Sequence, residues 1–240
     1  MKKQTLLFPF FSLLLIISTA FSSGGVHAQD CNSSLYQMKE GSTFTMTTFD
    51  PKDKLLVKAI HSYRKVNQTA DGFSAQMDQE MLDGKGQTMS KGTYEMSCQG
   101  GVVKLNIQDL MGVGMAMQNG SIKMEISGDA LELPSNLTVG QTLKNASFRM
   151  KGTMGEIKVM DRDFTVKERK VESKENLNTP AGTFDCYKVS YLMETTGMGG
   201  KTRTLKSVVW YAKGPGMIKN ESYDEKGKLT GYTLLTAYTK

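Results

Sequence analysis

Few residues of this chain could do chemistry, and the first of them is a cysteine. Cys186 lies in the stretch TPAGTFDCYKVSY, where a Pro-Ala-Gly turn precedes alternating residues. A cysteine becomes a nucleophile when a nearby base or positive charge keeps it as a thiolate. No histidine is near Cys186 in the sequence, and it alternates in phase with Phe184 and Lys188. We interpret Cys186 as an unpaired thiol in a strand, with a base brought close by folding as the alternative.

The second candidate is a histidine. The chain has two histidines, and His27 lies in an N-terminal segment that has the pattern of a signal peptide. His61 is therefore the remaining imidazole for a general base or a metal ligand. Because it is in phase with the apolar positions Val57, Ala59 and Tyr63, we expect His61 to be a hydrogen-bonded core residue.

Two carboxylates, Asp161 and Asp163, flank Arg162 and would share one face of a strand. Paired carboxylates suit glycosidic acid–base chemistry or a weakly bound cation, but we interpret this group as a polar turn. The sequence has no closely spaced zinc ligands, nucleophile elbow, phosphate loop or EF-hand loop. We therefore expect no catalytic residue, no metal and no cofactor, and conclude that the chain is not an enzyme.

The first 28 residues have the pattern of an export signal. Lys2 and Lys3 precede an apolar run, and small residues stand before an expected cleavage site between Ala28 and Gln29. The apolar run is too short for a membrane span of about 20 residues, and no later segment approaches that length. We expect residues 29–240 to form a single antiparallel β domain without a transmembrane segment, located in the periplasm, at the outer membrane or outside the cell.

Three cysteines in an exported chain allow one disulfide and one free thiol. Cys98 ends a strand-like stretch in phase with Tyr94 and Met96, and Cys31 would begin the exported domain. We expect a Cys31–Cys98 disulfide, with a Cys31–Cys186 link as the alternative. The residues Ala28-Gln29-Asp30 before Cys31 argue against its lipid modification.

Alternation with period two dominates the rest of the chain, which is typical of strands with one buried face. Short glycine-containing turns such as Asp83-Gly84-Lys85-Gly86 connect these stretches. The pattern predicts an all-β fold, an antiparallel meander of about twelve strands that forms a curved sheet, half-barrel or barrel, with a β-sandwich as the alternative. At most one short helix is expected, over residues 107–117. The similar segments FDPKDKL and YDEKGKL are interpreted as matching hairpin turns rather than a duplication.

The charge pattern excludes a nucleic-acid groove. The formal charge is +6, and loss of the two signal-segment lysines would leave +4. The remaining Lys and Arg residues are scattered among Asp and Glu, whereas nucleic-acid binding needs clustered positive charge.

Methionine is unusually frequent, with 17 residues in the chain. Flexible thioethers fill irregular apolar space and adapt to varied hydrophobic ligands, so the surplus fits either core filling or a pocket for a lipid or another apolar molecule. Methionines that fall outside strand alternation are the candidates for a pocket mouth, and the only tryptophan could line a cavity or anchor the core. The tentative ligand-binding residues are Met111, Met115, Met117 and Trp210.

Two stretches, TPAGTFDCYKVSY and VVWYAKGPGMIKNESYDEKGKL, resemble the paired signature of the TapB-like family, and LPSNLTVGQTL and YQMKEGSTF also fit it. That family groups exported envelope proteins of Gram-negative bacteria and is related to a periplasmic domain family of unknown function. The resemblance implies a curved antiparallel β-structure in the cell envelope, similar to the half-barrels that carry lipoproteins. It supplies no catalytic residues.

These observations favour a non-enzymatic envelope protein that binds a lipid or another apolar ligand inside a curved sheet. The alternative is an interaction or assembly factor of the outer envelope, which would act through contacts with an envelope protein.

Overall fold

The computed structural model describes residues 31, 34–69, 72–105, 123–197 and 199–240. Within these ranges the chain forms thirteen strands and no α-helix, which confirms the predicted all-β class. No helix in these ranges is long and apolar enough to cross a membrane. The expected signal segment 1–28 and the expected helix 107–117 lie outside the described residues.

All thirteen strands belong to one antiparallel sheet, in the order β6-β8-β9-β10-β11-β12-β13-β1-β2-β3-β4-β5-β7. The strands are β1 (Thr43–Phe49), β2 (Leu55–Thr69), β3 (Gly72–Asp83), β4 (Thr88–Gln99), β5 (Val102–Leu105), β6 (Lys123–Gly128), β7 (Leu131–Pro134), β8 (Ala146–Met154), β9 (Ile157–Thr179), β10 (Gly182–Thr196), β11 (Thr202–Ala212), β12 (Gly216–Tyr223) and β13 (Leu229–Thr239). Since one sheet contains every strand of the described ranges, the β-sandwich alternative is wrong.

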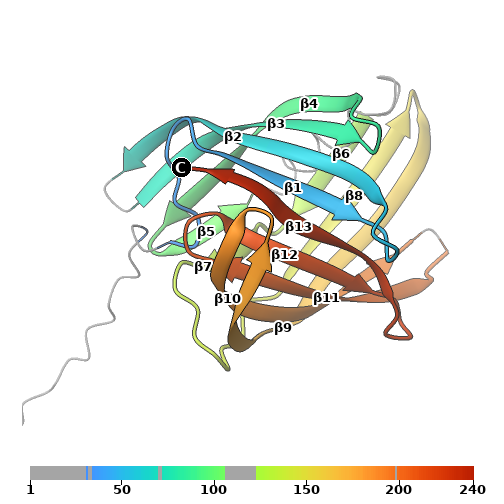
Figure 1. Cartoon of the computed structure of the whole chain (residues 1–240). Coiled ribbons are helices and arrows are strands. Elements are labelled where there is room, and N and C mark those ends of the chain that lie inside the picture. The colour runs from blue at the N-terminus through green and yellow to red at the C-terminus, as the bar shows by residue number, and fades with distance from the viewer. Residues whose placement is uncertain (1–30, 32–33, 70–71, 106–122, 198) are drawn as a thin grey trace, which may run out of the picture.

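The sheet is a meander that curls round on itself without closing (Figure 1). Consecutive strands pair from β8 to β13 and from β1 to β5, and β13 pairs with β1, so the last strand of the chain lies beside the first. The two edges of the sheet are β6 and β7, which are consecutive in the chain and separated by only Asp129 and Ala130. The chain therefore steps from one edge of the sheet to the other within two residues.

Three hairpin turns share one hydrogen-bonding pattern. In each, an aspartate side chain accepts hydrogen bonds from the backbone N–H groups two and four residues further on, at 2.8–2.9 Å. The aspartates are Asp50, Asp83 and Asp224. Because the Asp83 turn has a different sequence and the same geometry, the likeness of FDPKDKL and YDEKGKL fits the predicted common turn.

The interior of the curved sheet is filled by the chain's own side chains. Leu35 and Tyr36, which precede β1, are almost fully buried together with strand residues such as Met77, Ile218 and Leu235. The Tyr36 ring lies so close to Gly216 that a Cβ atom there would overlap it, and Gly216 has a φ of +80°. This segment is thus a built part of the core.

The disulfide joins Cys31 to Cys98 near the end of β4, as predicted. It fixes the start of the described chain against the sheet, directly ahead of Leu35 and Tyr36. Gly72 lies against the same site, where a side chain would overlap the Cys98 carbonyl group.

Replacing both cysteines of this bond, C31S/C98S, should lower the free energy of unfolding by about 4 kcal/mol, because the bond closes a loop with a sequence separation of 67. Chemical denaturation without reductant measures the difference. Wild-type protein in reductant is the matched control and should fall to the stability of the variant. Equal unfolding midpoints without reductant would show that the bond does not stabilise the fold.

Candidate functional site

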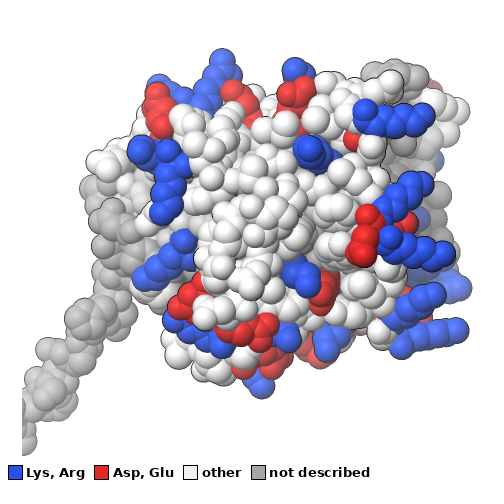
Figure 2. Space-filling model, viewed as in Figure 1, with Lys and Arg blue, Asp and Glu red and all other residues white. Residues whose placement is uncertain are grey.

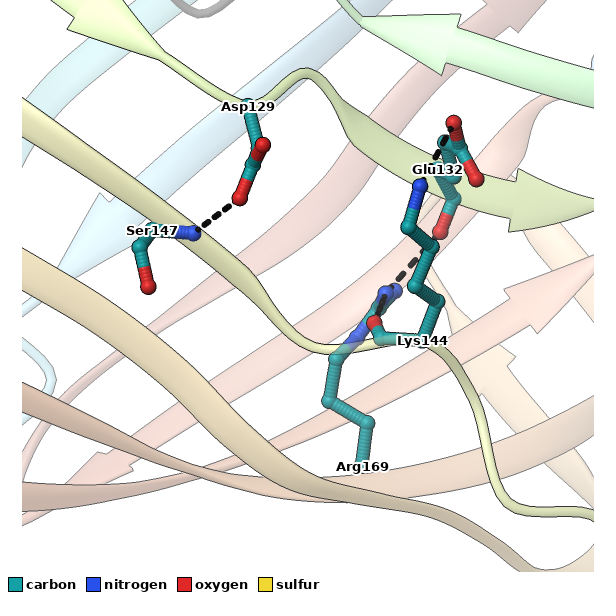
Figure 3. A network of polar contacts seen from close by, with 5 residues as sticks. All are labelled: Asp129, Glu132, Lys144, Ser147 and Arg169. Carbon is teal, nitrogen blue, oxygen red and sulfur yellow. Dashed lines mark hydrogen bonds and ion pairs between the residues drawn. The ribbon is translucent and has the colours of Figure 1, made fainter.

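The two edges of the sheet meet at a seam, which we define as β6, β7, their link Asp129–Ala130 and the parts of β4, β5, β8 and β9 that face them. The link is fixed to β8 by two hydrogen bonds, and Figure 3 draws the one that reaches the Asp129 side chain. The Asp129 N–H donates to the Ser147 carbonyl at 2.8 Å, and the Ser147 N–H donates to Asp129 Oδ2 at 3.0 Å. The step between the edges is therefore held at a defined position.

Arg169 of β9 closes one end of the seam. Its side chain is buried, and Nη1 donates to the carbonyl of Glu132 in β7 at 3.0 Å and to the carbonyl of Lys144 at 2.5 Å. An ion pair between Lys144 Nζ and Glu132 Oε1 at 3.3 Å lies over these bonds (Figure 3). Both carbonyls are part-buried and accept hydrogen bonds from a charged donor, which are stronger than those from a neutral donor. Arg169 therefore fastens edge strand β7 to β9, near the opposite edge.

A bulge in β9 directs Arg169 to this place. Glu168 has a φ of +54°, which is rare for a residue with a side chain. At this point the pairing skips a residue, because Ser190 pairs with Lys170 and Leu192 pairs with Lys167. A bulge re-aims the side chains of its strand, and Arg169 next to Glu168 is the buried charged residue of this stretch.

The other end of the seam is an open hollow of about 540 Å³. β4 pairs with β5 only through Met96–Gln99, so the part of β4 before Met96 has no strand partner on this side among the described residues. The hollow has an apolar part next to hydroxyl, carboxylate and ammonium groups. Its lining residues are Ser74, Glu95, Met96, Ser97, Lys104, Ile126, Ser127, Gly128, Asp129, Ala130 and Phe148. The hollow therefore presents apolar and charged groups side by side.

His61 is a core residue, as predicted. Its ring stacks on Phe44 with centroids 4.5 Å apart, and Nδ1 lies 3.0 Å from the Tyr94 hydroxyl. Burial lowers the pKa of His61 to about 4, so the imidazole is neutral at physiological pH.

Asp161 and Asp163 lie within strand β9 rather than in the expected polar turn. Asp161 accepts hydrogen bonds from Arg149 Nε and Lys158 Nζ, both at 2.8 Å, and Asp163 lies 3.7 Å from Arg149. The bonds from Arg149 and Lys158 hold the pKa of Asp161 far below its usual range. Asp161 is therefore an ionised partner of two cations, which is unsuited to proton transfer near neutral pH.

Cys186 is a free thiol buried in β10, as predicted. Its Sγ donates to the Phe184 carbonyl at 3.4 Å. Burial, assisted by Asp185 and Glu175, raises the pKa of Cys186 to about 12. The thiol is protonated at neutral pH and is a poor nucleophile.

Trp210 is 5% exposed on β11. Its indole Nε1 donates to Glu175 Oε1 at 2.6 Å, and the ammonium groups of Lys188 and Lys219 lie 5.3 and 5.1 Å from the ring centroid. These contacts occupy the ring with cation–π partners.

The ligand-lining role of Trp210 stays a prediction, and Met111, Met115 and Met117 lie outside the described residues. Across the described ranges, no cluster of three or more His, Cys, Asp or Glu side chains is placed to hold a metal ion.

Sequence patterns did not point to the seam. Arg169 stands in the charged run KERKVESKE, where nothing distinguishes it from the surface lysines. Asp129 and Ala130 resemble any short polar connection. In a regular strand, two residues on the same face are an even number of positions apart. Val166 and Val171 are both buried but five positions apart, and this odd spacing of two valines is the one signal of a bulge there.

A family model described as DUF3108-like matches residues 39–235. No curated protein matches the chain. Among solved structures, one similar protein comes from Parabacteroides distasonis, and its name assigns it provisionally to the lipoproteins. It is 23% identical to this chain, with a TM-score of 0.73, and the match covers 88% of this chain and 100% of that one. A second similar structure comes from Bacteroides fragilis, and its name describes it provisionally as an exported protein with a YmcC-like fold. It is 22% identical, with a TM-score of 0.70, and the match covers 85% of this chain and 98% of that one. Both structures share the fold of this chain.

His61 should make stability depend on pH. Unfolded histidine binds a proton near pH 6.5, whereas folded His61 stays neutral until about pH 4, so falling pH favours unfolding across this window. Wild type should lose about 3 kcal/mol relative to His61→Asn between pH 6.5 and 4, measured by urea unfolding at each pH. His61→Asn keeps a hydrogen-bonding group near Tyr94, and the same pH profile in both proteins would refute a neutral His61.

Arg169→Met should loosen edge strand β7, because the carbonyls of Glu132 and Lys144 lose their charged donor. We expect a loss of about 3 kcal/mol in the free energy of unfolding and faster hydrogen exchange at residues 131–133. Lys144→Ala is the matched control, since it removes only an exposed ion pair worth under about 1 kcal/mol. Wild-type exchange rates in Arg169→Met would contradict the role given to Arg169.

Proposed function

The chain belongs to the DUF3108-like family, and we propose that it is a non-enzymatic protein of the cell envelope that binds a protein partner through its outer surface. The names of the two structural relatives, one a provisional lipoprotein and one a provisional exported protein, support an envelope location. The export pattern of residues 1–28 supports it as well. The narrower TapB-like assignment is part of this proposal.

The filled interior is the observation that carries the proposal. Leu35 and Tyr36 lie against the strand residues of the core, and Met77, Ile218 and Leu235 are fully buried there. Protein cores are packed as densely as organic crystals, so an apolar ligand inside the sheet would have to displace these side chains. Binding at the outer surface requires no such rearrangement.

The state of the reactive groups supports a non-enzymatic role. His61 is buried and neutral, Cys186 is buried and protonated, and Asp161 is bonded to two cations. A catalytic acid, base or nucleophile needs a pKa near the working pH and access to substrate. None of these three groups meets both conditions.

A second candidate function is binding of a small amphipathic or apolar molecule in the hollow of the seam. The hollow has the size of many ligand sites, and Met96, Ile126 and Phe148 give it an apolar part. Such a ligand would lie between the sheet edges and leave the core intact.

Crosslinking of the protein in its own host, followed by native mass spectrometry, separates the two functions. The proposal predicts a crosslinked envelope protein and a native mass without a bound small molecule. A bound small molecule without a crosslinked protein would contradict it. If Ser127→Trp, which fills the hollow, abolishes that binding and Thr230→Trp, at an exposed position of β13, does not, the ligand occupies the seam.

A further inference from the structure

The end of the β8–β9 hairpin exposes a cluster of apolar side chains. Met154, Ile157 and Val159 are 45%, 64% and 40% exposed, and they are three of the six large hydrophobic side chains that are exposed in the described residues. Met154 and Ile157 are paired across the turn Gly155-Glu156. Cross-strand pairing of Met154 and Ile157 stabilises the hairpin only modestly, and neighbouring exposed apolar side chains are typical of an interaction surface.

This end of the hairpin projects beyond its neighbour. β9 pairs with β10 from Asp163 onward, so Ile157–Arg162 pairs with β8 alone. On its other side β8 pairs with β6 up to Thr153, and Figure 1 shows the hairpin at one end of the sheet. The exposed side chains of Met154, Ile157 and Val159 therefore lie at the end of the hairpin, here called the apolar tip, where they can enter a soft apolar layer.

Positive charge surrounds the apolar tip. Residues 149–163 and 196–204, the ends of the β8–β9 and β10–β11 hairpins, contain six Lys or Arg against three Asp or Glu. The Arg162 guanidinium lies against Gly197, which places the two hairpin ends side by side. Figure 2 shows Lys and Arg side chains projecting on this side of the molecule.

We propose that these two hairpin ends dock on an anionic phospholipid surface. Met154, Ile157 and Val159 enter the apolar layer, while the exposed cations Lys151, Arg162, Lys201 and Arg203 contact the anionic headgroups. A bilayer presents negative charge above an apolar interior, and the tip presents apolar side chains ahead of cations, so the two are complementary in order as well as in charge. This docking is independent of the partner or ligand proposed above.

Glu156 at the turn is the one acidic side chain at the tip of the hairpin, where it opposes an anionic surface. Removing its charge therefore gives a gain-of-binding test. Asp161, in contrast, is already bonded to Arg149 and Lys158.

Co-sedimentation with vesicles tests the proposal, using phosphatidylcholine alone and phosphatidylcholine mixed with phosphatidylglycerol. Wild type should bind the mixed vesicles roughly tenfold more tightly than the triple variant M154S/I157S/V159S, and salt should weaken this binding. Glu156→Gln should bind more tightly than wild type. Val139→Ser, which removes a single exposed valine elsewhere, is the matched control and should bind like wild type. All variants share the same N-terminal segment, so differences between them report on the hairpin.

Three results would overturn the proposal: equal binding by wild type and the triple variant, equal binding to both vesicle types, or no vesicle binding by a protein whose hairpin crosslinks to a protein partner. Because the replaced side chains are exposed, unchanged thermal unfolding of each variant excludes misfolding as the cause of a loss.

Discussion

The structure depends on how one open sheet holds its two edges together. β6 and β7 lie at opposite edges, yet the chain joins them through Asp129 and Ala130, so the sheet must curl until the edges meet. Strands at the edges of a sheet carry unpaired backbone groups that need other partners. Arg169 supplies such a partner for β7 by donating to the Glu132 carbonyl from β9. A bulge with strained backbone at Glu168 places it there, and strain of this kind persists only where surrounding contacts enforce it.

The curl of the sheet limits where a ligand or partner can bind. It encloses a space that Leu35, Tyr36 and the inward side chains of the strands fill, with the Cys31–Cys98 disulfide fixing the start of that segment. Among the described residues, two external features stand out, the seam hollow and the apolar hairpin tip. The buried neutral His61 and the ion-paired Asp161 agree with the surface role proposed for the chain.

Much of the fold followed from the sequence because strand alternation and hairpin turns are local signals. The all-β meander, the disulfide, buried His61 and the free Cys186 thiol were predictable in this way. The seam was not, because alternation identifies a buried face but not the partner of an edge strand. Arg169 was hidden by a bulge that changes the phase of β9, and Ile157 and Val159 alternate as buried residues would although both are exposed.

The central claim is that the interior of the sheet belongs to the chain itself and not to a ligand. A crystal structure of the protein purified from its own host tests this claim most directly, through the electron density around Tyr36 and Leu235. The account predicts density for the chain's own side chains alone, with the Tyr36 ring packed on Gly216. Continuous density for an apolar molecule there, with Tyr36 displaced from Gly216, would contradict it.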